Sequence, residues 1–238
     1  MTSRLFTYRS LAALFLSLGA AASLHAQGHP FSLPPTPGRY SPLDHREQMG
    51  QVGQWQLIAK PSLYGYYQPV RIEVPTQGLV SFYTPDSPQP VLSQAPAQAS
   101  MLVGGVYRFR VTGLPEYPGL EIYPTVEVLD RLHPTGQEQA FPIPVTITPE
   151  EIEAVIREQM VTKVIYLERP QLASALEVDR TGLVTYDVPA SSNLIDTADQ
   201  LGRPMAILRI GGRQPDPMNP HDELLRGALP LQIQSVAP

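Results

Sequence analysis

Cysteine is absent from this chain of 238 residues, and charged side chains are scarce, at 16%. Without thiols the protein has no disulfide bonds, cysteine nucleophiles or thiolate metal sites, so its fold rests on packing alone. Acidic residues number 22 against 17 basic ones, and Lys60 and Lys163 are the only lysines. This negative balance argues against general nucleic-acid binding, which needs a basic surface to neutralise phosphates. The hydrolase motif G-x-S-x-G and the zinc motif H-E-x-x-H are also missing.

A run long enough to cross a membrane is missing as well. The clearest apolar run, residues 11–18, falls short of the roughly 20 residues that span a bilayer. Two arginines precede it and four small residues follow it, which is the pattern of a signal peptide. We therefore expect a signal peptide over residues 1–26, cleaved after residue 22 or 26. Its removal takes away two arginines and shifts the net charge from −5 to −7. The mature chain is then expected to be periplasmic or extracellular, without a transmembrane segment, and either soluble or held to the envelope only through a partner.

Proline, by contrast, is abundant, with 27 residues against 17 glycines. Proline ends helices and interior strands, so prolines between short apolar runs favour a β domain with stiff loops. Five of them fall in residues 27–48, which show little periodicity. We expect that segment to be a proline-rich tether, either extended or lying along the domain surface.

Alternating apolar and polar residues predict several strands. The clearest pattern is a hairpin over 106–129, with Val111 opposite Leu120 and Arg110 opposite Glu121, and with Thr125 and Glu127 facing water. A loop is expected over 84–98. A capping box predicts a helix from Thr148 to about Met160, and a second helix should precede a positive-φ Gly202. The remaining strands are expected at 55–58, 70–74, 78–83, 161–167, 182–188 and 205–210, with an edge strand at 229–236.

These elements predict a mainly β protein with minor α content. Residues 49–147 form a β-sandwich-like unit and residues 148–238 a small α/β unit. The two are either separate domains or parts of one. Because the connection Phe141–Pro144 is apolar and stiff, we favour units that share one core.

Aromatic residues supply the candidate binding site: Trp55, Tyr64, Tyr66 and Tyr67 gather around a glycine near the start of the β pattern. Tyrosines on a loop can anchor a protein partner or stack on a sugar at low entropic cost. The alternative is that some of them pack on the edge of the sandwich. No catalytic residue, metal ligand or cofactor is assigned. The acidic stretch from Asp216 to Glu223 matches no calcium loop and is interpreted as solvated.

Two segments also carry a resemblance to other proteins. Glu121-Ile-Tyr-Pro-Thr-Val-Glu-Val-Leu-Asp130 and Ala198-Asp-Gln-Leu-Gly-Arg-Pro-Met-Ala-Ile-Leu-Arg209 resemble segments of uncharacterised exported proteins of planctomycete-type bacteria. The resemblance implies export and a cell-envelope setting. It implies no activity and no functional residues.

The leading hypothesis is therefore an exported, non-enzymatic envelope structural or protein-interaction module. A carbohydrate-binding module that uses the same aromatic residues is the alternative. A hydrolase acting on envelope polymers is a third hypothesis, and it requires a cleft lined by Asp196, Asp199, His133 and His221.

Overall fold

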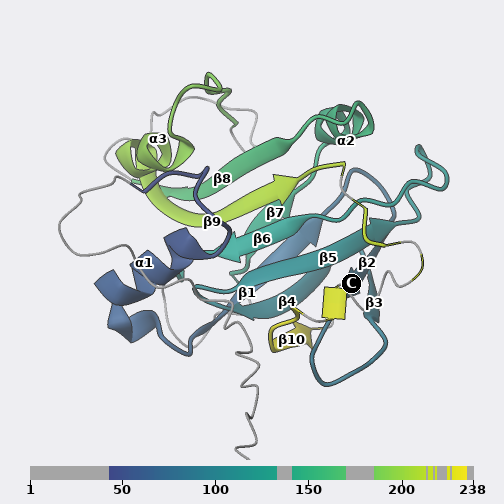
Figure 1. Ribbon diagram of the computed structural model, residues 1–238, viewed down its shortest axis with the longest axis horizontal. Helices are drawn as coiled ribbons and strands as arrows, with labels where there is room; N and C mark the ends of the chain where they lie inside the picture. Colours follow the sequence, from purple (N-terminus) through teal and green to yellow (C-terminus); the bar gives the residue numbers. More distant parts are fainter. Residues whose placement is uncertain are drawn as a thin grey trace, which may run out of the picture.

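Two β-sheets form the framework of the protein in the computed structural model (Figure 1). The structure describes residues 43–132, 141–169, 185–212, 214–216, 218, 224–225 and 227–234. The expected signal peptide and residues 27–42 of the expected tether lie outside them. No helix in the described ranges has the length and apolar character that crossing a bilayer requires.

The first sheet has the strand order β10-β4-β1-β7, and the second has the order β3-β2-β5-β6-β9-β8. Strands from residues 49–147 and from residues 148–238 occur in both sheets. The strands are β1 (Tyr67–Glu73), β2 (Leu79–Phe82), β3 (Val91–Gln94), β4 (Ala97–Leu102), β5 (Val106–Thr112), β6 (Thr125–Val128), β7 (Ile143–Thr146), β8 (Val161–Glu168), β9 (Gly202–Ile210) and β10 (Leu231–Gln234). The helices are α1 (Gln51–Ala59), the 3₁₀ turn η1 (Pro61–Leu63), α2 (Pro149–Ile156) and α3 (Leu194–Leu201).

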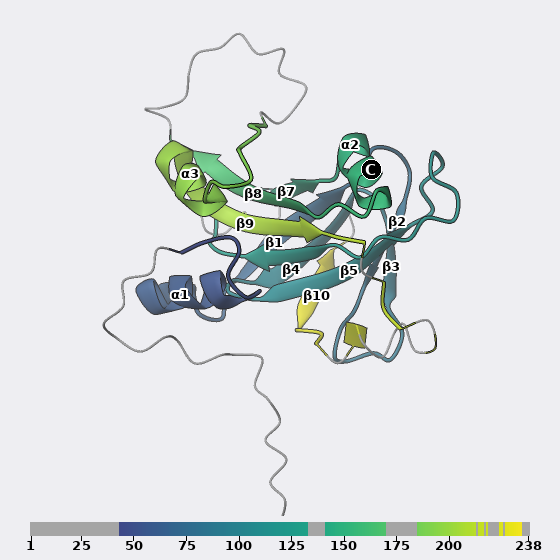
Figure 2. The same ribbon diagram turned by 45° about the horizontal axis from the view of Figure 1, so that its top comes forward.

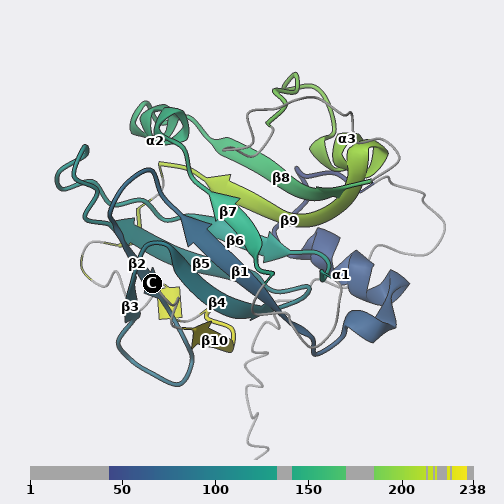
Figure 3. The same ribbon diagram turned by 180° about the vertical axis from the view of Figure 1, so that it is seen from behind.

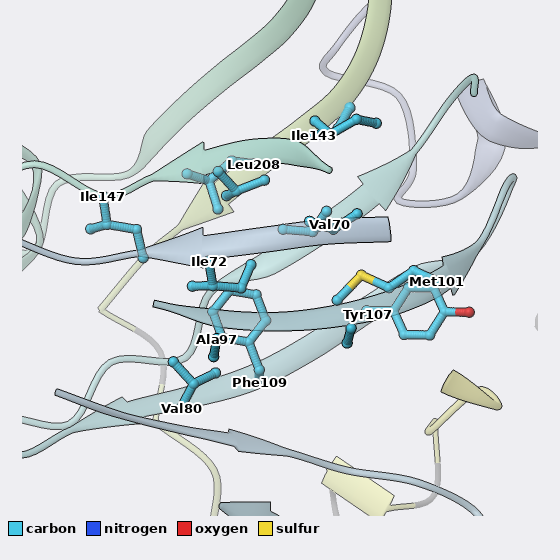
Figure 4. Packing of buried hydrophobic residues seen from close by; sticks show 14 of the residues in the cluster. Val70, Ile72, Val80, Ala97, Met101, Tyr107, Phe109, Ile143, Ile147 and Leu208 are labelled. Atoms are coloured by element: carbon cyan, nitrogen blue, oxygen red, sulfur yellow. The ribbon is translucent and has the colours of Figure 1, made fainter. Parts of the chain in front are cut away.

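The core lies between the two sheets, where alternate residues of each strand meet (Figure 4). Val70 and Ile72 of β1 pack there with Phe109 of β5 and Leu208 of β9, and all four are fully buried. This arrangement confirms the expected β-sandwich-like architecture with minor α content. A second, smaller cluster lies on the other face of the six-stranded sheet and joins Val52, Leu129, Ile195 and Ile207.

The hairpin of β5 and β6 exists, but its predicted register is wrong by two residues. Val111 lies opposite Ile122 instead of Leu120, because backbone hydrogen bonds from Leu120 N–H to Tyr117 O and from Tyr117 N–H to Leu114 O draw Leu120 into the turn. A shift of two keeps every side chain on its face. The Arg110–Glu121 ion pair therefore still forms, at 3.7 Å.

Thr125 and Glu127 were expected to face water, and both are buried. β6 lies inside the six-stranded sheet, between β5 and β9, so its outer face is available for packing. The Gly53 N–H in α1 donates to Glu127 Oε1 at 2.8 Å. An alternating pattern gives the two faces of a strand, but it does not reveal that a helix covers the polar one.

The strand predicted at 55–58 is wrong, since these residues belong to helix α1. Short apolar runs are ambiguous between the two structures. Gly50, with a left-handed φ of 90°, precedes the helix, and Val52 and Gly53 are its buried residues. A Cβ on Gly53 would lie 2.9 Å from the Gly104 Cα, so glycine allows the helix to approach the β4–β5 turn.

Residues 43–48 of the expected tether belong to the folded domain. Arg46 Nη2 donates to the Ala190 carbonyl at 2.6 Å, and Asn193 Nδ2 donates to the Leu43 carbonyl at 2.6 Å. The Leu194 N–H donates to His45 Nδ1 at 3.2 Å. These hydrogen bonds fasten the chain before α1 to the start of α3. Figure 2 shows that α3 lies above α1, at the same end of the sheets.

The remaining expectations are met in part. The capping box at Thr148 is confirmed, but α2 ends at Ile156, before Glu158, which has a φ of 59°. Gly202 has an extended φ of −171° and no left-handed cap, because it begins β9 against β8. The loop expected over 84–98 contains β3 and the start of β4. Of the strand expected at 182–188, residues 185–188 form no strand, and residues 182–184 lie outside the described residues. The strands expected at 70–74, 78–83, 161–167, 205–210 and 229–236 correspond to β1, β2, β8, β9 and β10.

Candidate interaction surface

A short, tightly bonded corner connects α1 to β1. The Lys60 N–H closes α1 on Gln56 O at 2.8 Å, and Pro61 begins η1. Leu63 is buried and packs in the main core. After it, the Tyr66 N–H donates to Leu63 O and the Val103 N–H donates to Tyr66 O. The corner is therefore anchored at both ends and in the middle.

Tyr64 projects from this corner into solvent and is 83% exposed. Its backbone is held by the hydrogen bond from its N–H to Pro61 O. The next residue, Gly65, has a φ of 74°, and no atom outside its chain neighbours lies within 4 Å of where its Cβ would be, so the corner is open to solvent at this residue. Ile58, at the end of α1, is 55% exposed. A large aromatic ring on a fixed backbone is the kind of side chain that anchors protein interfaces.

The other three predicted residues are less accessible. Tyr66 is half-buried, and the Arg131 guanidinium lies 4.9 Å from the centre of its ring, in a cation–π contact. Tyr67 begins β1 opposite Leu102 and is half-buried. Trp55 is half-buried in α1. Tyr66 also packs against the main core, so of the four predicted residues only Tyr64 is exposed.

Asp130, which follows β6, organises the charges beside these tyrosines. It is 3% exposed, and its Oδ2 lies 2.7 Å from Lys60 Nζ and 3.7 Å from Arg203 Nη1. Its Oδ1 accepts the Arg131 N–H at 2.8 Å. Arg203 also donates to the Arg131 carbonyl at 3.2 Å. The buried Asp130 carboxylate thus gathers three cations, Lys60 and Arg203 through ion pairs and Arg131 through its backbone N–H.

We call this surface the tyrosine end, and it consists of Ile58, Lys60, Tyr64, Tyr66, Arg131 and Arg203. Its three cations against the single carboxylate of Asp130 leave a formal excess of two positive charges. Beside it, Glu168 and Arg169 at the end of β8 carry opposite charges, and Arg169 Nη2 donates to the carbonyl of Asp199 on α3, where Asp196 and Asp199 are exposed acidic side chains. In a chain of net charge −5, the six named residues of the tyrosine end thus combine a formal positive excess with the exposed side chains of Ile58 and Tyr64.

A buried ion pair lies beneath the start of α1. Arg209 Nη1 donates to Glu127 Oε2 at 2.9 Å, and Arg209 Nη2 donates to the His45 carbonyl at 3.1 Å. Desolvation is the largest effect on His45 and, despite the nearby Asp44 carboxylate, lowers its pKa. The pair joins β6, β9 and the segment before α1, so the elements that carry the tyrosine end have a rigid base.

Sequence reasoning missed Lys60, Asp130, Arg131 and Arg203. The scarcity of lysine was a weak signal for Lys60, but the four residues meet only in space, across separations of up to about 140 positions. Asp196 and Asp199 lie on the exposed face of α3, as expected. His133 and residues 219–223 fall outside the described residues. Within the described ranges, no three His, Asp or Glu side chains cluster as metal ligands would.

The candidate surface rests on this geometry and on the distances within it. Its aromatic residues and Lys60 come from the corner between α1 and β1, and its other charged residues come from the end of β6 and the start of β9. Comparison with family models, with curated proteins and with solved structures finds no match to this chain.

Proposed function

We propose that this chain is an exported, non-enzymatic protein-interaction module of the cell envelope, and that it binds its partner through the tyrosine end. The observation that carries the proposal is Tyr64, 83% exposed on a corner that Leu63 anchors in the core. Fixing such a ring beforehand lowers the entropy that binding must offset.

The surroundings of Tyr64 support a protein partner. Interfaces are enriched in tyrosine and arginine, and the tyrosine end combines both with the exposed apolar side chain of Ile58. Arg131 and Arg203 are held by Tyr66 and Asp130, so their side chains are already oriented. Export is proposed from the N-terminal 26 residues, which have the pattern of a signal peptide.

Co-purification from the envelope fraction tests the proposal. The tagged wild-type chain should recover a protein partner in constant ratio. Tyr64→Ala should reduce that recovery by about tenfold, as the loss of a central aromatic anchor does. Tyr186→Ala is the matched control, because Tyr186 is also an exposed tyrosine but lies between β8 and α3.

Equal recovery of the same partner with both variants would reject the tyrosine end as the binding surface. Recovery of a polysaccharide instead of a protein, lost only with Tyr64→Ala, would reject the protein partner in favour of a glycan. Both results require that the variants keep the wild-type melting temperature, which the exposure of both side chains leads us to expect.

A further inference from the structure

The opposite end of the sandwich carries exposed apolar surface with negative charge. There the turn between β5 and β6 lies beside α2 (Figures 1 and 3). Desolvation and the nearby carboxylates of Glu153, Glu116 and Glu150 raise the pKa of Tyr117 in that turn. We call this surface the acidic end, and it consists of Glu116, Tyr117, Glu150, Glu153, Ile156 and Met160.

The acidic end matches the tyrosine end in composition and opposes it in sign. Met160 is 68% exposed and Ile156 is 50% exposed. Three carboxylates, with Arg157 paired to Glu153 at 3.7 Å, leave a formal excess of two negative charges. Glu151 does not add to it, because Lys163 pairs with it. The named residues of each end therefore join exposed apolar side chains to a formal excess of two charges, positive at one end and negative at the other.

The two ends point away from each other. β1 starts at the tyrosine end with Tyr67, directly after Tyr66. It finishes at Glu73, whose carbonyl accepts the Ile147 N–H just before α2. A seven-residue strand covers about 20 Å, so one copy is unable to join its own two ends. The acidic end of a second copy can reach the tyrosine end of the first.

We infer that copies of this chain associate head to tail, with the acidic end of one copy seated on the tyrosine end of the next. The inference rests on the proposed function and identifies the partner as a second copy. Each contact leaves one end of each copy free, so the interface is heterologous and builds an open chain or a ring. Opposite charges orient the copies, and Tyr64 with Ile58 meets Ile156 with Met160.

Sedimentation velocity of the purified chain tests the inference through two variants at exposed positions. Tyr64→Glu places a negative charge at the tyrosine end. Glu153→Lys with Met160→Lys reverses the charge of the acidic end, and the Glu153–Arg157 pair it breaks is exposed and contributes little to stability. Leu92→Glu on β3 is the control, since Leu92 is 59% exposed and belongs to neither end.

At low salt the wild type and Leu92→Glu should sediment as species larger than one copy. Each end variant alone should lose about tenfold or more in association constant. A mixture of the two end variants should recover association, because each contributes the end that the other has altered. About 0.5 M salt should weaken the wild-type assembly, since it shortens the Debye length to a few ångströms.

A wild-type chain that stays a single copy at low salt would overturn the inference. So would end variants that associate as the wild type does, or a mixture that recovers nothing. The two proposals can be distinguished. If the wild type is a single copy but recovers a different envelope protein, and Tyr64→Ala loses that protein, the head-to-tail contact is wrong and the proposed function stands.

Discussion

Glu127 and Arg209 form an ion pair that is almost completely buried: Glu127 is 0% exposed, Arg209 is 6% exposed, and their charged atoms lie 2.9 Å apart. Both side chains face away from the main core, toward α1 and the segment before it. The Gly53 N–H and the His45 carbonyl complete the hydrogen bonds of the pair. The pair thus fastens the N-terminal segment, which leads to the tyrosine end, onto β6 and β9.

Breaking this pair on one side should be costly. Arg209→Met leaves a buried carboxylate without its cation, and we expect a loss of about 3–5 kcal/mol in the free energy of unfolding, measured by denaturant titration. Adding Glu127→Gln should restore much of it, because the amide oxygen still accepts the Gly53 N–H. Arg157→Ala, which removes an exposed pair, is the control and should cost less than about 1 kcal/mol. An equally small loss for Arg209→Met would contradict the account.

Stability should fall in mild acid because of His45. Its folded pKa is lowered, chiefly by desolvation, below the ordinary histidine value of 6.5. The unfolded chain therefore binds the proton more readily, so the stabilisation is complete above pH 6.5 and is lost as the pH falls through the folded pKa. His45→Asn keeps an acceptor for the Leu194 N–H and removes the titration. Melting temperatures from pH 7.5 to 5 should drop less for the variant; parallel curves would show that His45 has no part in the acid loss.

Removing the Ser81 hydroxyl should leave stability unchanged or raise it by up to about 1 kcal/mol. Ser81 is 0% exposed, and its Oγ has no hydrogen-bond partner in the part of the chain that the structure describes. Ser81→Ala therefore removes an unsatisfied group. Thr148→Ala is the contrasting case, since its Oγ1 accepts the Glu151 N–H and its loss should cost about 1 kcal/mol. A clear loss of stability with Ser81→Ala would contradict this account, because it would mean that the hydroxyl stabilises the folded chain.

Some of the fold follows from residues close together in sequence. The capping box at Thr148 and the Arg110–Glu121 pair were predictable because each depends on a local pattern within a helix start or one hairpin. Trp55 illustrates the limit: the run QWQLI is compatible with helix or strand, and the close approach of the neighbouring Gly53 to Gly104, which is distant in sequence, does not follow from the local pattern. Asp130 and Lys60 lie 70 positions apart, so no local sequence pattern predicts their ion pair.

Gly202 shows the same limit, and it supplies a further prediction. A Cβ at this position would overlap the Leu167 carbonyl in β8, so Gly202→Ala should force the two strands apart. We expect a cost of about 1–3 kcal/mol in the free energy of unfolding. Gly211→Ala is the control, because no atom lies within 4 Å of its Cβ position. Similar stability for both variants would show that β8 and β9 are less closely packed than described.

The most direct measurement for the tyrosine end is photo-crosslinking from position 64, with the probe amino acid in place of Tyr64 and the chain left in its native envelope fraction. The account predicts crosslinked peptides from a protein, and from residues 149–160 of a second copy if the chains associate head to tail. The same probe at exposed position 92 should not give these products. Crosslinks from position 64 that stay within one chain, or that match those from position 92, would contradict a binding role for this surface.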